Sequence, residues 1–238
     1  MLHLIHTLLP MKKLVVFSGA GVSAESGIKT FRDSGGLWEK YEIMDVATPE
    51  AWNRQPEVVL EFYNARRKQV MESEPNQGHV IIAELESYFD VEVITQNIDD
   101  LHERAGSTKV MHLHGEIRKS KSSIKPSLIY PIEGDKIEWG ETCELGSQLR
   151  PHVVWFGEEV PMMAPAERLV NEANILVVVG TSLNVYPAAS LVFHARRDCK
   201  IYLVDPGDPL IPNQLDIKWF KEKASEGMRK VRSVILNE

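Results

Sequence analysis

Short, almost continuously apolar segments rich in β-branched residues constrain the fold of this chain most strongly. Such segments are typical of parallel strands that are covered on both faces. The six segments are Leu14–Phe17, Val91–Thr95, Val110–Leu113, Val153–Phe156, Ile175–Val179 and Ile201–Val204. Helix-like stretches lie between several of them, so the alternation predicts an α/β fold with a doubly wound parallel sheet.

Two stretches interrupt this alternation and predict a smaller inserted lobe. Residues 45–73 have a helical pattern without a strand, and residues 117–149 are polar with short apolar patches. We therefore expect one domain over residues 11–238, with its main lobe built from 11–44, 74–116 and 150–238. The expected helices of the chain are Pro56–Met71, Gly78–Phe89, Pro165–Ala173, Pro187–Arg197 and Lys223–Leu236.

Composition excludes several classes of function. A net charge of −7 makes nucleic acid an unexpected partner. Two cysteines argue against a disulfide framework and favour a reducing compartment, so we expect a cytoplasmic protein. No apolar run is long enough to span a membrane. The first ten residues lack the basic start of a secretory signal, and Met11 is the more natural beginning of the domain.

A glycine-rich turn follows the first apolar segment. Gly19, Gly21 and Gly27 stand where a backbone turns tightly and approaches a phosphate-bearing cofactor closely. The spacing departs from the usual dinucleotide fingerprint, so a tight strand–helix connection without a ligand explains the turn equally well. Further along, glycines flank Phe31 and Arg32, which is typical of a loop that closes over a ligand.

Polar residues follow the next two predicted strands. Gln96, Asn97 and Asp99 stand at a strand's carboxyl end, where open α/β sheets bind ligands, although a helix cap is the simpler explanation. His114 is a candidate general base, because imidazole titrates near neutral pH. His112 is close by, but no third ligand with suitable spacing follows, so we expect no metal site.

Five runs in this order resemble the sirtuins, which are NAD-dependent protein lysine deacylases. They are GAGVSAESGIKTFRDSGGLWE, TQNIDDLHERAG, HLHGE, RPHVVWFGE and VVVGTSLNVYPAA. The resemblance extends from about Lys13 to the end of the chain. It implies a Rossmann-type sheet, NAD as a consumed co-substrate, and proteins with acylated lysines as substrates. The products would be free lysine, nicotinamide and O-acyl-ADP-ribose.

The resemblance also implies roles for individual residues. Catalysis would use His114 as the general base together with Asn97, Asp99 and Arg32. Residues that would contact NAD are Gly19, Ala20, Gly21, Ser23, Glu25, Phe31, Arg32, Trp38, Gln96, Asn97, Ile98, Asp99, Gly180, Thr181, Ser182, Asp205, Pro206, Gly207 and Ala224. Residues that would contact the acylated peptide are Tyr63, Arg66, Val154, Phe156, Gly157 and Glu158.

Tyr63 and Arg66 point to the kind of acyl group. They are three residues apart and share a helix face, where a guanidinium and a phenol hydroxyl can bind a carboxylate. The arrangement resembles that of the sirtuin subgroup that removes succinyl, malonyl or glutaryl groups, with some deacetylation expected as well. A solvated basic face is the competing explanation, because Arg66, Arg67 and Lys68 form a charge run.

One departure from the family concerns zinc. Most sirtuins hold a structural zinc with four cysteines, whereas residues 117–149 contain only Cys143. One cysteine cannot form a tetrahedral thiolate site, so we expect no zinc. Ion pairs and an apolar patch are the expected substitute. The charged residues are Arg118, Lys119, Lys121, Glu133, Asp135 and Glu138, and the apolar ones are Leu128, Ile129, Tyr130, Ile132 and Trp139.

Three other functions remain open from the sequence. An ordinary lysine deacetylase would use the same catalytic residues, and a protein mono-ADP-ribosyltransferase would cleave the same bond of NAD. A non-catalytic module that binds NAD or ADP-ribose is the third. We expect a monomer without a membrane or nucleic-acid partner.

Overall fold

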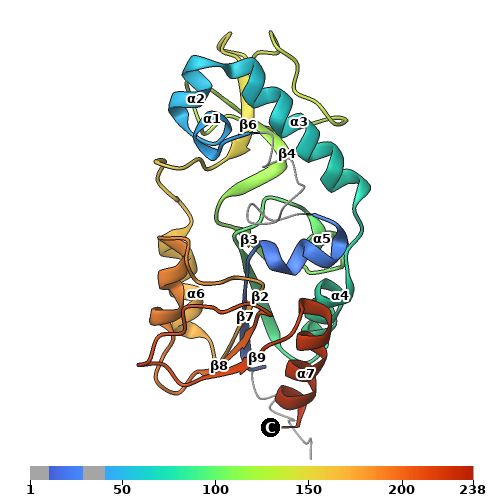
Figure 1. Cartoon of the computed structure of the whole chain (residues 1–238), viewed down its shortest axis with the longest axis vertical. Coiled ribbons are helices and arrows are strands. Elements are labelled where there is room, and N and C mark those ends of the chain that lie inside the picture. The colour runs from blue at the N-terminus through green and yellow to red at the C-terminus, as the bar shows by residue number, and fades with distance from the viewer. Residues whose placement is uncertain (1–10, 29–40, 238) are drawn as a thin grey trace, which may run out of the picture.

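Six parallel strands form the larger sheet, in the order β3-β2-β1-β7-β8-β9. The computed structural model describes residues 11–28 and 41–237 of the 238-residue chain. The strands are β1 (Lys13–Ser18), β2 (Asp90–Thr95), β3 (Val110–His112), β7 (Ile175–Val179), β8 (Lys200–Val204) and β9 (Ile217–Phe220). This arrangement confirms the predicted doubly wound parallel sheet, which forms the lower part of the molecule in Figure 1.

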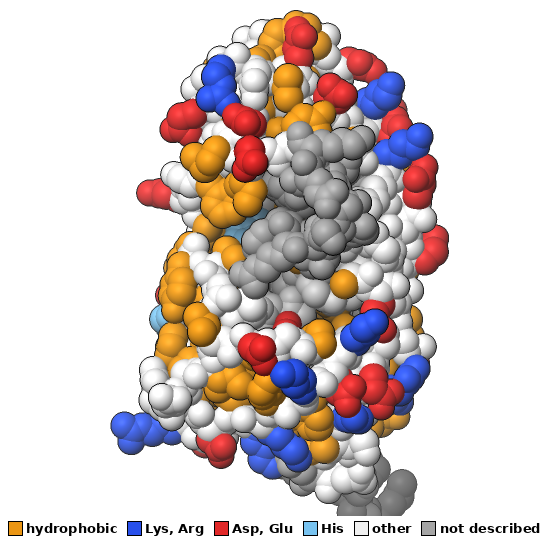
Figure 2. Space-filling model, in the orientation of Figure 1, with side chains coloured by type: hydrophobic (Ala, Val, Ile, Leu, Met, Phe, Trp, Pro, Cys, Tyr) orange, Lys and Arg blue, Asp and Glu red, His pale blue; other side chains and the backbone are white. Residues whose placement is uncertain are grey.

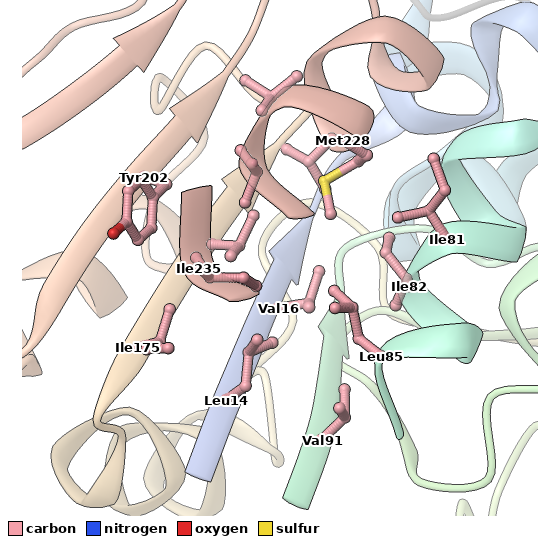
Figure 3. Close-up of a cluster of buried hydrophobic side chains, with 14 of the residues drawn as sticks. Leu14, Val16, Ile81, Ile82, Leu85, Val91, Ile175, Tyr202, Met228 and Ile235 are labelled. Carbon is pink, nitrogen blue, oxygen red and sulfur yellow. The ribbon is translucent and has the colours of Figure 1, made fainter. Parts of the chain in front are cut away.

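Helices cover both faces of this sheet. On one face, Leu14 and Val16 pack under α4 (Gln77–Glu84), the short 3-10 helix Leu85–Ser87 and α7 (Ala224–Leu236), as Figure 3 shows. On the other face, Val15 and Phe17 contact residues of α6 (Met163–Glu172) and the 3-10 helix Ala188–His194. Alternate residues of β1 are therefore buried on opposite faces, each contributing about 1.5–3 kcal/mol. This double burial is the reason for the continuous apolar segments.

The smaller lobe combines three helices with an antiparallel sheet. Its helices are α1 (Ile43–Val46), α2 (Pro49–Arg54) and α3 (Pro56–Glu72). Its strands are β4 (Gly115–Ser122), β5 (Ile129–Pro131) and β6 (Leu149–Val153), in the order β5-β4-β6. The helical insertion thus has the secondary structure expected of it, and this lobe lies above the main sheet in Figure 1.

One predicted strand of the main sheet is wrong. Val153–Phe156 does not join the parallel sheet, because Leu149–Val153 pairs antiparallel with β4 and residues 154–156 lie outside any strand. Val153 and Trp155 are instead buried in the apolar cluster of the small lobe. A short apolar run predicts that the segment is buried, but it does not predict which sheet the segment joins.

The edge strand β9 was not predicted from the sequence, because its exposed Lys218 interrupts the apolar pattern.

A buried arginine stabilises the small lobe. Arg67 has no exposed surface, and its Nε donates to the Ile117 carbonyl at 2.7 Å. Its Nη1 donates to Asn64 Oδ1 at 2.6 Å and to the Asp135 carbonyl at 3.1 Å. Arg67 therefore joins α3 to β4 and to the loop that follows β5. Hydrogen bonds of a charged donor to buried carbonyls contribute more than exposed ion pairs.

The expected substitute for zinc is only partly correct. The apolar cluster beside Arg67 comprises Leu60, Ile132, Ile137, Cys143 and Leu149, with Leu128 and Tyr130 packed against it. Trp139 and Ile129 were expected in this patch but are exposed. Of the charged residues expected to form ion pairs here, only Lys119 forms one within the described ranges, with Glu116 at 2.8 Å.

Two negative findings concern metals and membranes. Within residues 11–28 and 41–237, no group of three or more His, Cys, Asp or Glu side chains is arranged to hold a metal ion. No helix in the same ranges combines the length and the apolar character needed to cross a bilayer.

Two buried histidines lie beneath the carboxyl ends of β1 and β2. His102, on α5 (Leu101–Arg104), donates its Nε2–H to Ser18 Oγ at 2.8 Å, and that hydroxyl donates to Thr95 Oγ1 at 2.9 Å. The ring centroid of His79 lies 4.9 Å from that of His102. Burial lowers the pKa of His79 to about 4 and lowers the pKa of His102 well below its ordinary value.

Acid should therefore destabilise the fold through these histidines. Below about pH 6.5 the unfolded chain binds protons that the folded protein does not, so stability falls by about 1.4 kcal/mol per pH unit for each histidine. Between about pH 7 and 5.5, we expect the free energy of unfolding, measured with urea, to fall by about 1 kcal/mol less in His79→Gln than in wild type. The control His194→Gln, at a partly exposed histidine, should keep the wild-type loss. Equal losses in wild type and His79→Gln would contradict this account.

Candidate active site

The strand order creates a crevice between the loops that follow β1 and β7. β2 and β3 extend the sheet on one side of β1, whereas β7, β8 and β9 extend it on the other. Loops after β1 and β7 therefore leave the sheet at the point where the strand order reverses. Open α/β sheets bind ligands at this point, outside the carboxyl ends of the strands.

Glycines allow the two loops to touch. The N–H of Gly21 donates to the Gly180 carbonyl at 2.8 Å. A Cβ on Gly21 would lie 2.8 Å from the Gly180 Cα, and one on Gly180 would lie 2.1 Å from the Val22 nitrogen. Gly180 also has a φ of 65°, which favours glycine. Gly19 is equally confined, because its Cβ would lie 2.7 Å from the Cβ of Thr181.

Asn97, Ser23 and Asp99 form a buried hydrogen-bonded chain in this crevice. Asn97 Nδ2 donates to Ser23 Oγ at 3.1 Å, and Ser23 Oγ donates to Asp99 Oδ2 at 3.0 Å. The Leu101 N–H donates to Asp99 Oδ1 at 3.3 Å. Asp99 Oδ1 therefore accepts an N–H at the start of α5, but the N-cap residue of that helix is Asp100, so the helix-cap explanation is not the one observed. The other oxygen, Oδ2, belongs to the hydrogen-bonded chain. Burial raises the pKa of Asp99 against these hydrogen bonds.

His114 is held as a neutral ring. Its Nδ1 lies 2.9 Å from the Gln96 carbonyl, which can only accept, so Nδ1 carries the proton. The Nε2 of the neutral ring then keeps its lone pair. Burial lowers the pKa of His114, and the bond to Gln96 only partly offsets this. The ring therefore has the geometry and protonation state of a general base.

The pKa of His112 is shifted in the opposite direction. Its Nδ1 lies 2.9 Å from the Asn97 carbonyl, and its Nε2 lies 2.7 Å from Glu103 Oε1. Burial disfavours the charged ring, but the bond to Glu103 and its charge outweigh burial and raise the pKa of His112. The Asn97 carbonyl can only accept, so Nδ1 donates and His112 holds the Asn97 backbone.

A cavity of about 250 Å³ connects these groups with the small lobe. It brings together thirteen residues that the sequence analysis assigned to the site: Ala20, Ser23, Tyr63, Arg66, Gln96, Asn97, Ile98, Asp99, His114, Val154, Phe156, Gly157 and Glu158. Phe156 and Tyr186 line it and are exposed. In Figure 2, hydrophobic side chains and a histidine are visible where the two lobes meet.

Tyr63 and Arg66 both line this cavity and do not form a solvated basic face. Tyr63 is buried, its hydroxyl oxygen accepts the Trp155 indole N–H at 3.0 Å, and burial raises its pKa to about 12. Burial lowers the pKa of Arg66, while the nearby Tyr63 and Asp99 oppose that shift. The three residues of the charge run lie in three environments: Arg66 lines the cavity, Arg67 is buried in the protein and Lys68 is exposed.

The other described residues assigned to NAD lie outside this cavity, in the loops after β1, β7 and β8 and at the start of α7. Thr181 Oγ1 accepts from Gln96 Nε2 at 3.2 Å. The Glu25 carboxylate accepts the Ser225 N–H at 2.8 Å, where α7 begins. Asp205 Oδ1 accepts the Gly207 N–H at 2.8 Å, as in a simple turn. Gly180, Ser182, Pro206 and Ala224 lie in the same loops or at the start of α7. Phe31, Arg32 and Trp38 lie outside the described residues.

Several lining residues were missed. Val185, Tyr186 and Pro187 belong to the run VVVGTSLNVYPAA, and Trp155 belongs to RPHVVWFGE. Both runs carry the family resemblance, but the resemblance assigned no role to these four residues. Ile28 follows the glycine turn directly, and Val160 follows the RPHVVWFGE run. Val153 belongs to RPHVVWFGE like Trp155, whereas Ile43, Ala47 and Val70 reach the cavity through tertiary packing, which no local pattern reveals.

Comparisons with known proteins agree with this geometry. A sequence model described as "Sir2 family" matches residues 19–187. A protein named NAD-dependent protein deacylase from Helicobacter pylori (strain J99 / ATCC 700824) is 55% identical over 196 residues, covering 82% of this chain and 83% of its own. A protein of the same name from Bacteroides thetaiotaomicron is 49% identical over 231 residues, which cover 95% of this chain and 99% of that protein.

A solved structure shows the same similarity. The crystal structure of a Sir2 homologue in complex with NAD has a TM-score of 0.84 and 40% identity to this chain. The match covers 94% of this chain and 91% of that one.

Proposed function

This chain belongs to the Sir2 family and is an NAD-dependent protein deacylase, and we propose that it removes acidic acyl groups such as succinyl and malonyl from lysine. One observation carries the proposal: Tyr63 and Arg66 line the same cavity as His114 and Asn97. Acyl recognition and acyl transfer would then occur within one enclosure. Acylated proteins are its substrates.

The glycines leave backbone without side chains where NAD would approach. Gly19, Gly21 and Gly180 let the loops after β1 and β7 pack against each other at the point where the sheet order reverses. NAD supplies the ADP-ribose that accepts the acyl group, with release of nicotinamide. We assign the glycine turn to its diphosphate, and Asn97 and Asp99 to its nicotinamide end. The NAD contacts of Phe31, Arg32 and Trp38 stay predictions of the resemblance.

His114 is the proposed general base. Its Nδ1 is committed to the Gln96 carbonyl, so only Nε2 can take a proton from a ribose hydroxyl. The lowered pKa keeps Nε2 unprotonated at neutral pH. A rigid, neutral imidazole at this position can accept the proton without first losing one.

A carboxylate in the acyl tail matches the inner part of the cavity. Arg66 provides a guanidinium and Tyr63 a hydroxyl, both in a largely buried setting where a carboxylate needs a cation. An acetyl group offers neither side chain an acceptor. Deacetylation should persist at a lower rate, because His114 and NAD act on the amide end of the tail.

The proposal includes a small lobe that folds without zinc. Cys143 is the only cysteine between β4 and β6, and the other cysteine of the chain, Cys199, directly precedes β8. The hydrogen bonds of Arg67 and the cluster around Ile137 provide the stabilisation that a metal would otherwise give.

The acyl preference can be tested with matched peptides. We expect wild type to have a higher kcat/KM for succinyl-lysine than for acetyl-lysine. Arg66→Met and Tyr63→Phe should each reduce that ratio about ten- to hundredfold, because a hydrogen bond to a charged group contributes about 1.5–3 kcal/mol. Lys68→Met, an exposed position on the same helix, is the control and should keep the ratio. Preference for acetyl-lysine with an unchanged ratio in Arg66→Met would identify an ordinary deacetylase.

The base is testable through pH. A base with a lowered pKa predicts that kcat/KM falls on the acid side only below about pH 6.5. His114→Ala should lose about 10²- to 10⁴-fold in kcat, whereas His194→Ala, outside the cavity, should not. Release of free lysine, measured by mass spectrometry, separates deacylation from ADP-ribosylation of protein. An acidic limb above pH 7, or full activity of His114→Ala, would refute the assignment.

A further inference from the structure

Trp155 connects the acyl cavity to the interior of the small lobe. Its side chain is buried, and its indole N–H donates to the Tyr63 hydroxyl at 3.0 Å. The guanidinium carbon of Arg150 lies 3.5 Å from the centroid of the indole ring. The ring of Trp52 packs nearby, with centroids 5.8 Å apart. Trp155 is therefore held by packing, by a cation–π contact and by a hydrogen bond.

Glu158 fixes Trp155 from the other side. Its carboxylate accepts from Arg150 Nη2 at 2.7 and 3.0 Å, and from the Trp155 backbone N–H at 2.8 Å. Arg150 is almost fully buried, at 8% side-chain exposure, and Glu158 is at 25%. One carboxylate thus fixes both the backbone of Trp155 and the cation that lies over its ring. The indole N–H has little freedom to point anywhere but at Tyr63.

The chemistry of the two groups gives their hydrogen bond a direction. An indole N–H can only donate, so the Tyr63 oxygen must accept. The phenol proton prefers the plane of its ring, and the position facing Trp155 is already filled. It therefore points the other way, and within residues 11–28 and 41–237 no side chain or carbonyl group is seen to accept it. Because Tyr63 lines the cavity, its hydroxyl would act as a donor toward an acyl tail bound there.

We propose that Trp155 is a specificity-determining positioning residue that commits Tyr63 to donate, so that the cavity favours a carboxylate tail over a carboxamide of the same shape. This inference rests on the acidic-acyl function proposed above. A carboxylate presents acceptors only, and it matches the donors of Tyr63 and Arg66. The NH₂ of a carboxamide would place a donor against a donor unless the Tyr63 hydroxyl could turn.

Phenylalanine at position 155 removes the N–H and keeps an aromatic ring. In Trp155→Phe the Tyr63 hydroxyl can rotate and accept from an amide. Three peptides on one sequence separate the effects: succinyl-lysine, its isosteric carboxamide (succinamyl-lysine) and acetyl-lysine. The measured quantity is the ratio of kcat/KM for the carboxylate to that for the carboxamide, with KM and kcat determined separately.

We expect Trp155→Phe to reduce this ratio about three- to tenfold, mainly through KM. Tyr63→Phe should reduce it as well, and the double variant should match Tyr63→Phe within about twofold, because Trp155 acts only through that hydroxyl. Trp52→Phe is the control, since Trp52 packs in the same cluster without a hydrogen bond to Tyr63, and it should keep the wild-type ratio. An unchanged ratio in Trp155→Phe, or a further loss in the double variant, would overturn the proposal.

A second readout is independent of activity. In ¹⁵N-tryptophan-labelled protein, the indole N–H signal of Trp155 is identified by its loss in Trp155→Phe, and it should shift in Tyr63→Phe but not in Lys68→Met. An unshifted signal in Tyr63→Phe contradicts the hydrogen bond itself.

The two proposals can fail separately. If wild type does not prefer succinyl-lysine over acetyl-lysine, the proposed acidic-acyl function is wrong. If that preference depends on Arg66 and Tyr63 but not on Trp155, only the role proposed for Trp155 is wrong.

Discussion

The backbone contact between Gly21 and Gly180 is the constraint on which the site depends. It joins the loops after β1 and β7 at the reversal point of the sheet, and neither position has room for a Cβ. This contact fixes the course of the chain after β1, which brings Ser23 against Asn97 and Asp99. A side chain at either glycine would separate the loops and move that hydrogen-bonded chain. The glycines therefore serve the packing of the protein as well as the approach of NAD.

The pKa values of two neighbouring histidines are shifted in opposite directions. His112 and His114 both bond to backbone carbonyls of the loop after β2. Glu103 bonds to His112 and not to His114, so the pKa of His112 is raised, whereas burial lowers the pKa of His114. The small lobe then adds Tyr63 and Arg66 to the same enclosure.

The sequence predicted the main sheet because strands buried on both faces require continuous apolar runs. The same reasoning failed at Val153–Phe156, where the burial is in the small lobe. Gln96, Asn97, Asp99 and His114 line one cavity because the carboxyl ends of parallel strands meet at one edge. The local pattern alone favoured a helix cap at Asn97 or Asp99, and the common site was implied only by the resemblance.

Tertiary contacts account for what the sequence did not reveal. Arg66, Arg67 and Lys68 read as one charged face, but a helix turns about 100° per residue and sends them to the cavity, the interior and solvent. The hydrogen bond between Trp155 and Tyr63 joins residues that are 92 positions apart, and no local sequence pattern predicts it. The stabilisation of the small lobe by Arg67 depends on carbonyl groups of separate segments in the same way.

A crystal structure of the protein with a succinyl-lysine peptide would test the central claim most directly. The account predicts that the succinyl carboxylate lies within about 3 Å of the Tyr63 hydroxyl and the Arg66 guanidinium. It also predicts that the lysine amide lies on the His114 side of the same cavity. A peptide bound in the cavity with its carboxylate in solvent, away from both side chains, would contradict the claim that Tyr63 and Arg66 select the acyl group.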